Sequence, residues 1–168
     1  MEYPMVVLIH VALGVFWAGG TLTAGFFLVP SVLEAGPAGG AVMAGIVKRK
    51  FPAVMIAAGT VVVLTGLRLF MVRWTSAFIT STEGIVLSLG GLVAIGALFI
   101  GVFVQRPVTM RLGMLAAQVA ASGGPPSPEQ ARELEALRTR LGKVARVTAW
   151  HAVAAVVLMA SHRLAAVL

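Results

Sequence analysis

The chain has 168 residues, of which 59% are hydrophobic and only 11% are charged. In soluble domains roughly a quarter of the residues are charged, so this composition excludes an ordinary soluble protein and indicates an integral membrane protein. The chain has no cysteine, which excludes disulfides, thiolate metal sites, iron–sulfur clusters and covalent attachment of haem. No linker is long enough to divide the sequence, and we expect residues 1–168 to form one domain.

The first apolar segment is expected to run from about Met5 to Val29, where Pro30 stops it before a Gly/Ala/Pro-rich loop around residues 34–45. Because it lacks the basic start of a secretory signal, we interpret it as a retained helix. Three further segments have the length of about 20 residues that a membrane crossing needs, at about residues 51–72, 84–105 and 147–168. The predicted fold is therefore an all-α, four-helix transmembrane bundle.

Residues 106–146, between the third and fourth spans, have a different composition and are expected to form a cytoplasmic helical hairpin that turns at residues 122–126. Ser127 is a typical N-cap, and Gln130 lies where it would close a capping box. One helical face then repeats apolar residues, which would pack on an extension of the third span: Leu134, Leu137, Leu141 and Val144 against Leu112, Leu115 and Val119.

The formal charge of +7 reflects 13 Lys and Arg residues against 6 Asp and Glu residues. The basic residues are unevenly distributed along the chain. Three of them, Arg68, Arg73 and Arg163, fall on one side of the predicted membrane, and the rest flank the other side. An excess of Lys and Arg in short loops marks the cytoplasmic face. We therefore expect a bacterial-type inner (plasma) membrane, both termini outside, and anionic lipids rather than nucleic acid as the partners of this charge. The cytoplasmic set is Lys48, Arg49, Lys50, Arg106, Arg111, Arg132, Arg138, Arg140, Lys143 and Arg146.

The histidines give the clearest indication of function. His10 lies near the start of the first span and His162 near the end of the last, so antiparallel threading places both at a similar depth. Imidazoles are costly in lipid and usually face a bundle interior, a partner or a cofactor. The pair predicts two axial ligands of a non-covalent b-type haem. Two alternatives stay open: copper held by His10, His162 and a methionine, and a transporter or accessory protein whose histidines bond only to protein groups.

Other residues near the same depth fit a haem site. Gly14 lies one turn from His10 and would leave room for a porphyrin edge, and Trp17 follows on the same helical face. The glycines of this helix fit a plain packing role equally well. Arg68, about one turn from the outer end of the second span, is either a side chain that reaches the interface or a counter-charge for a haem propionate.

A second site is predicted near the opposite face, where His151 and Met55 lie at comparable depths and His/Met ligation of haem is chemically acceptable. No Asp or Glu lies deep in any span, and no P-loop, HExxH or Ser/His/Asp pattern is present. The expected function is therefore electron transfer or a haem-linked oxidoreduction, with a quinone or another redox molecule as partner. The Gly-rich faces of the first and third spans are also compatible with a homo-oligomer.

Two stretches resemble the CopD/HemJ-like membrane proteins. The run Ile9-His10 through Trp17-Ala18-Gly19-Gly20 to Pro30 resembles their first helix, which has His, then Trp seven residues later, then a Gly pair or Ala-Gly. The segment from Lys48-Arg49-Lys50-Phe51 to Thr65-Gly66-Leu67 is similar to their second helix. The resemblance covers about the first seventy residues.

This resemblance implies a four-helix membrane unit in which His10 serves as a haem ligand, as in the HemJ branch of protoporphyrinogen oxidases, or lies in a copper-uptake module, as in the CopD branch. The HemJ third helix carries a functional Lys shortly after its start, whereas residues 84–89 here contain Ser88 and no Lys. His151 and His162 have no counterpart in the family pattern.

Overall fold

A computed structural model of the chain describes residues 2–165. Helices and short turns account for these residues, and no strand occurs among them. Four helical segments are long and apolar enough to cross a membrane: Tyr3–Glu34, Phe51–Val72, Thr82–Ala121 and Pro128–His162. The all-α bundle is thus confirmed, and the chain is a multi-pass membrane protein. Its elements, with η marking π-helical segments, are α1 (Glu2–Thr23), η1 (Ala24–Leu28), α2 (Val29–Glu34), α3 (Gly36–Lys48), α4 (Phe51–Val72), α5 (Ser76–Thr80), α6 (Thr82–Ile100), η2 (Gly101–Gln105), α7 (Arg106–Ala121) and α8 (Pro128–Ala165).

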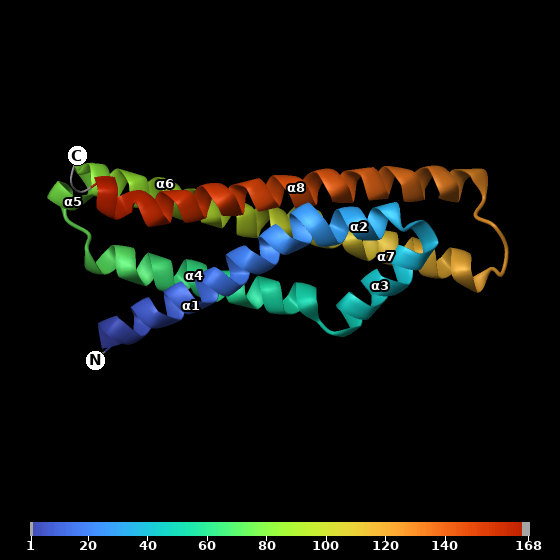
Figure 1. Ribbon diagram of the computed structural model, residues 1–168, viewed down its shortest axis with the longest axis horizontal. Helices are drawn as coiled ribbons and strands as arrows, with labels where there is room; N and C mark the ends of the chain where they lie inside the picture. Colours follow the sequence, from blue (N-terminus) through green and yellow to red (C-terminus); the bar gives the residue numbers. More distant parts are fainter. Residues whose placement is uncertain (1, 166–168) are drawn as a thin grey trace.

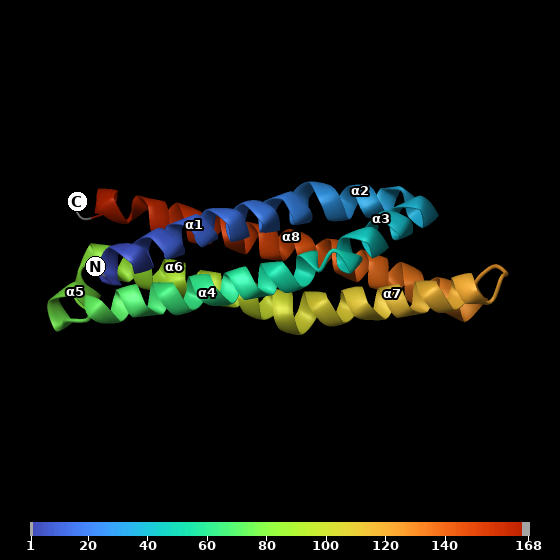
Figure 2. The same ribbon diagram turned by 90° about the horizontal axis from the view of Figure 1, so that it is seen from below.

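The helices form an elongated bundle (Figures 1 and 2). Helix α1 packs on α4 and α8, and α6 packs on the same two helices, which gives the order α1, α4, α6, α8 around the bundle. The start of α1 and the end of α8 lie at one end, here called the terminal end, and the α7–α8 turn lies at the other, the hairpin end (Figure 1). The first long helix meets α8 where Gly25 of η1 lies against Ala145 and Ala149, and α1 separates from α8 toward the terminal end (Figure 1).

The prediction that Pro30 stops the first helix is wrong. The helix passes through η1 and continues as α2 to Glu34. Proline lacks an N–H, and its ring collides with the carbonyl one turn earlier in a regular α-helix. A π-helical segment changes the hydrogen-bonding partners of that turn. The segment η1 ends at Leu28, with one residue between it and Pro30, and η2 ends at Gln105, likewise with one residue before Pro107. Both prolines are therefore accommodated inside long helices.

The predicted loop around residues 34–45 is also wrong, because most of it belongs to helix α3. The chain reverses at Gly36, whose φ of 59° is unfavourable for other residues. Gly39 then packs so closely on the backbone of Val32 that no Cβ would fit there. The glycines that predict a loop instead allow α2 and α3 to close as a helical hairpin.

The predicted hairpin between the third and fourth spans is present, with α7 ending at Ala121 and α8 beginning at Pro128. Its capping box is confirmed: Ser127 N–H donates to Gln130 Oε1 at 2.9 Å, and Gln130 N–H donates to Ser127 Oγ at 3.2 Å. The predicted packing of α7 on α8 is confirmed by a buried cluster to which α2 and α3 also contribute. It contains Val29, Val108, Leu141 and Ala145, with Leu33, Met43, Leu112 and Leu137 against them.

A second buried cluster fills the membrane-spanning half of the bundle. Trp17 is its largest side chain, and the rest come mainly from alanines on the other three long helices. Small side chains let transmembrane helices approach closely, so the four helices converge around the indole. The members are Trp17, Ala58, Val62, Ala94, Ala97 and Ala155.

Candidate functional site

The imidazole of His10 is held by helix α4. Its Nδ1 lies 3.0 Å from the carbonyl oxygen of Val62 and 3.0 Å from Thr65 Oγ1. A carbonyl oxygen only accepts hydrogen bonds, so Nδ1 carries the proton and donates it. The Thr65 hydroxyl donates its own proton to the carbonyl of Val61 at 2.7 Å, which leaves its oxygen able to accept from His10. In this tautomer Nε2 of His10 keeps its lone pair.

Two glycines of α4 lie where the rings of His10 and Trp17, on α1, contact the α4 backbone. A Cβ on Gly66 would lie 2.8 Å from Cε1 of His10, and a Cβ on Gly59 would lie 2.6 Å from Nε1 of Trp17. His10 and Trp17 are two helical turns apart on α1, as Gly66 and Gly59 are on α4. These four residues form what we call the ring-on-glycine seam. It fixes the register of α1 on α4 and the position of both rings.

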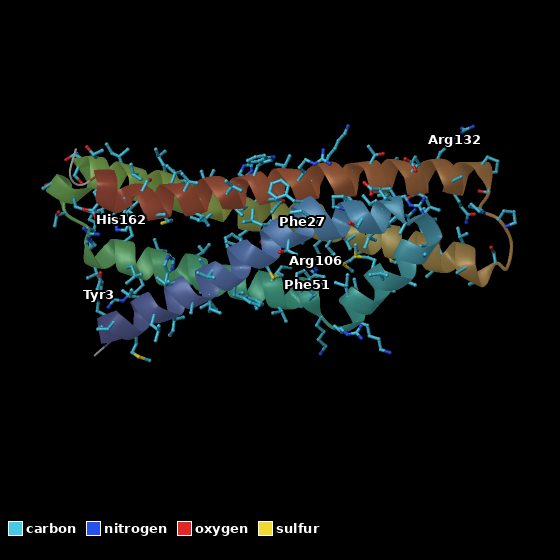
Figure 3. All side chains as sticks on the ribbon, viewed as in Figure 1. Tyr3, Phe27, Phe51, Arg106, Arg132 and His162 are labelled. Carbon is cyan, nitrogen blue, oxygen red and sulfur yellow. The ribbon has the colours of Figure 1, made fainter. Side chains whose placement is uncertain are left out.

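His162 lies near the end of α8, at the terminal end of the bundle (Figure 3). Trp17 and Ala155 belong to the same buried cluster, and each histidine lies two turns, about 10 Å, further toward the terminal end. Figure 3 shows His162 and Tyr3 at this end of the molecule. Nδ1 of His162 donates to the carbonyl of Met159 at 2.7 Å. Within residues 2–165 no hydrogen bond joins the two imidazoles, because His10 turns to α4 and His162 to its own helix.

His151 repeats the same arrangement closer to the hairpin end. Its Nδ1 donates to the carbonyl of Val147 at 2.8 Å, and its Cδ2 faces Gly96 of α6. Met55, the predicted second ligand, packs instead on Gly20 of α1. The structure therefore places these two side chains against different helices. All three histidines donate Nδ1–H to a carbonyl and keep the Nε2 lone pair.

Gly14 and the arginines complete the predicted site. A Cβ on Gly14 would meet nothing within 4 Å, so no close helix contact requires this glycine. Arg68 is exposed on α4. Arg73 forms an ion pair with Glu83 at 2.9 Å and lies over the ring of Phe78, 4.5 Å from its centre. The side chain of Arg163, predicted on the same side of the membrane, lies outside the described part of the chain.

The described residues contain no group of three or more His, Cys, Asp or Glu side chains that could hold a metal ion. Two surface hollows, of about 730 and about 300 Å³, are lined mainly by the hairpin-end half of α8 rather than by the histidines. Sequence reasoning missed the α4 residues that hold His10, namely Val62, Thr65 and Gly66. The only signal for them was Thr65-Gly66 in the stretch that resembles the CopD/HemJ-like second helix.

Comparison with known proteins adds no further assignment: the chain matches no protein-family model, no curated protein and no solved structure.

Proposed function

We propose that this protein binds a b-type haem in the membrane and serves electron transfer or a haem-linked oxidoreduction. The observation that carries the proposal is the tautomer of His10. Histidines that ligate metals commonly donate their other ring N–H to a carbonyl or carboxylate, which fixes the ring and makes it a better ligand. The bond from His10 Nδ1 to Val62 has this form, and it leaves Nε2 as the ligating atom.

The set of available ligands favours haem over a bare metal ion. A porphyrin supplies four nitrogen ligands of its own, so a haem needs only one or two axial side chains. A zinc ion held by the protein alone needs three or four side chains, and no group of three His, Cys, Asp or Glu side chains that could hold one lies within the described residues. In this proposal His10 and His162 supply the two imidazoles that a haem would use.

The remaining residues take roles that follow from their positions. His10 and His162 are the proposed axial ligands, the open space at Gly14 accommodates the macrocycle edge, and Arg68 holds a propionate. The haem, when bound, would supply reversible one-electron transfer at its iron. His151 and Met55 are the proposed residues for a second haem, where a rearrangement of Met55 away from Gly20 is required.

The two stretches that resemble CopD/HemJ-like proteins meet at His10. The His10–Trp17 stretch of α1 contacts the Thr65–Gly66 stretch of α4 through hydrogen bonding and the ring-on-glycine seam. This contact supports reading both stretches as parts of one site. The basic residues around the hairpin end support a proposed orientation in the inner membrane with the hairpin in the cytoplasm and both termini outside.

The experiment that tests the assignment compares absorption spectra of the wild-type chain and three variants, each purified in detergent from a haem-replete host. His10→Ala is expected to lose the Soret band, and His162→Ala to keep a shifted band typical of altered axial ligation. His151→Ala keeps the terminal-end site and serves as the matched histidine control. Thermal unfolding of each variant separates ligand loss from misfolding.

Retention of the complete wild-type spectrum in a folded His10→Ala variant would overturn the ligand assignment. Wild-type protein that is colourless but binds copper stoichiometrically would instead support the copper-handling alternative.

A further inference from the structure

A basic groove lies between α2 and α8, on the hairpin-end side of the apolar spans. Its volume is about 300 Å³, and Leu33 of α2 faces Arg138, Lys143 and Arg146 of α8 across it. Gly142 lies in the groove, where a Cβ would be 3.3 Å from Leu33 Cδ1. The lining thus combines one apolar side chain from α2 with three cations from α8.

The positive charge of this groove is not neutralised by the surrounding protein. Glu135 is the single carboxylate among its lining residues. Within the described residues, Arg138, Lys143 and Arg146 form no ion pair with a carboxylate closer than 4 Å. Three cations beside one carboxylate favour an anion, and guanidinium groups bind phosphate with paired hydrogen bonds.

The groove opens next to an aromatic pair that marks the edge of the membrane. Trp150 lies one turn beyond Arg146 on the same face of α8 and is 60% exposed. It packs edge-to-face on Phe26 of η1, with ring centres 5.3 Å apart. Tryptophan concentrates at membrane–water interfaces. Figure 3 shows Phe27, beside this pair, in the middle of the molecule and Arg132 toward the hairpin end, so the cations lie on the aqueous side of the aromatic pair.

We propose that this groove binds the headgroup of an anionic phospholipid from the adjacent leaflet. Arg138, Lys143 and Arg146 contact the headgroup phosphate, and the acyl chains lie over the Phe26–Trp150 pair. A phospholipid fits better than free phosphate because apolar Leu33 lines the groove beside the cations, and the exposed Trp150 follows Arg146 by one turn of α8. The inference is independent of haem binding.

Binding can be measured with dioctanoyl phosphatidylglycerol titrated into the detergent-solubilised full chain. Dioctanoyl phosphatidylcholine and inorganic phosphate serve as comparison ligands. The test variant is R138Q/K143Q/R146Q. The control is K48Q/R49Q/K50Q, which removes the same charge at the α3–α4 turn, on the opposite side of the bundle in Figure 1. Circular dichroism confirms that both variants keep their helices.

We expect saturable binding of phosphatidylglycerol to the wild type. The affinity should fall about tenfold or more in the groove variant and less than about twofold in the control, since each basic residue near an anionic headgroup adds to the free energy of binding. Phosphatidylcholine should bind weakly. Equal affinity of the wild type and groove variant, or equal weakening in the control, would overturn the site. Inorganic phosphate that binds as tightly as the lipid would show a phosphate site and overturn the lipid assignment.

Discussion

The imidazole of His10 lies directly on the backbone of Gly66, where a Cβ would approach Cε1 to 2.8 Å. The hydrogen bond from His10 Nδ1 to Val62 and the contact of Trp17 with Gly59 hold α1 and α4 in the same register. Because the backbone of α4 and the Thr65 hydroxyl fix the His10 ring, its free Nε2 has a defined position before any ligand binds. Such preorganisation is what a ligating histidine needs.

Replacing Gly66 by alanine should displace the His10 ring and weaken its bond to Val62. Forcing extra atoms into a packed site typically costs about 1–3 kcal/mol, so the melting temperature in detergent should fall and haem content should fall with it. Gly91→Ala is the matched control, because a Cβ there meets nothing within 4 Å. A Gly66→Ala variant with wild-type stability and wild-type haem content would show that the His10–Gly66 contact is not needed.

A second prediction concerns the close contact between η1 and α8. A Cβ on Gly25 would lie 2.6 Å from the carbonyl oxygen of Ala145 and 2.6 Å from Cβ of Ala149. Gly25→Ala should therefore destabilise the fold by about 1–3 kcal/mol, and Ala149→Gly should partly restore it because only one of the two clashes is removed. Thermal unfolding of the four members of this double-mutant cycle gives the coupling energy, with Gly19→Ala as the open-space control.

Contacting residues commonly couple by about 0.5 kcal/mol or more. Additive effects of Gly25→Ala and Ala149→Gly would contradict the close approach of η1 to α8.

Breaking the capping box at the start of α8 should cause the first turn of that helix to fray. Ser127→Ala removes the acceptor for the Gln130 N–H, which typically costs about 1 kcal/mol. Hydrogen exchange of the amides in the first turn of α8 should accelerate about fivefold to tenfold, since 1.4 kcal/mol is a factor of ten in an equilibrium constant. Gln118→Ala, at an exposed position of α7, should leave exchange in that turn unchanged. Equal exchange in the wild type and Ser127→Ala would show that the cap does not hold the turn.

The proposed orientation can be tested because the chain has no cysteine. Single cysteines are introduced at Ser122, in the α7–α8 turn, and at Ser76, in the α4–α6 connection, both of which are exposed. In intact cells a membrane-impermeant maleimide should label Ser76→Cys and not Ser122→Cys, and both should react after lysis. The reverse pattern would place the hairpin outside.

Much of the fold could be predicted from the sequence because its signals are local. The second span was predicted at residues 51–72, as in α4, and the Ser127–Gln130 capping box depends only on residues that are neighbours in sequence. The end of the first helix could not be predicted in this way. Pro30 is accommodated by η1 and by burial of the preceding Val29 in the cluster that contains Val108, Leu141 and Ala145. Both features depend on contacts between distant segments.

The sequence predicts a similar depth for His10 and His162 but not the orientation of their rings. Antiparallel threading carries the depth prediction, and each histidine lies seven residues from a member of the Trp17–Ala155 cluster. Which neighbour His10 faces depends on the order of the helices and on their rotation. Sequence periodicity does not show that α1 lies beside α4, so the contact of the His10 ring with Gly66 could not be predicted.

The most direct test of the central claim is the absorption spectrum of the wild-type chain, purified in detergent from a haem-replete host. The His10 geometry predicts a Soret band that shifts when dithionite reduces the iron, with haem extractable by acid because no cysteine attaches it. A folded chain that stays colourless, and that gains no Soret band when haem is added, would contradict the claim.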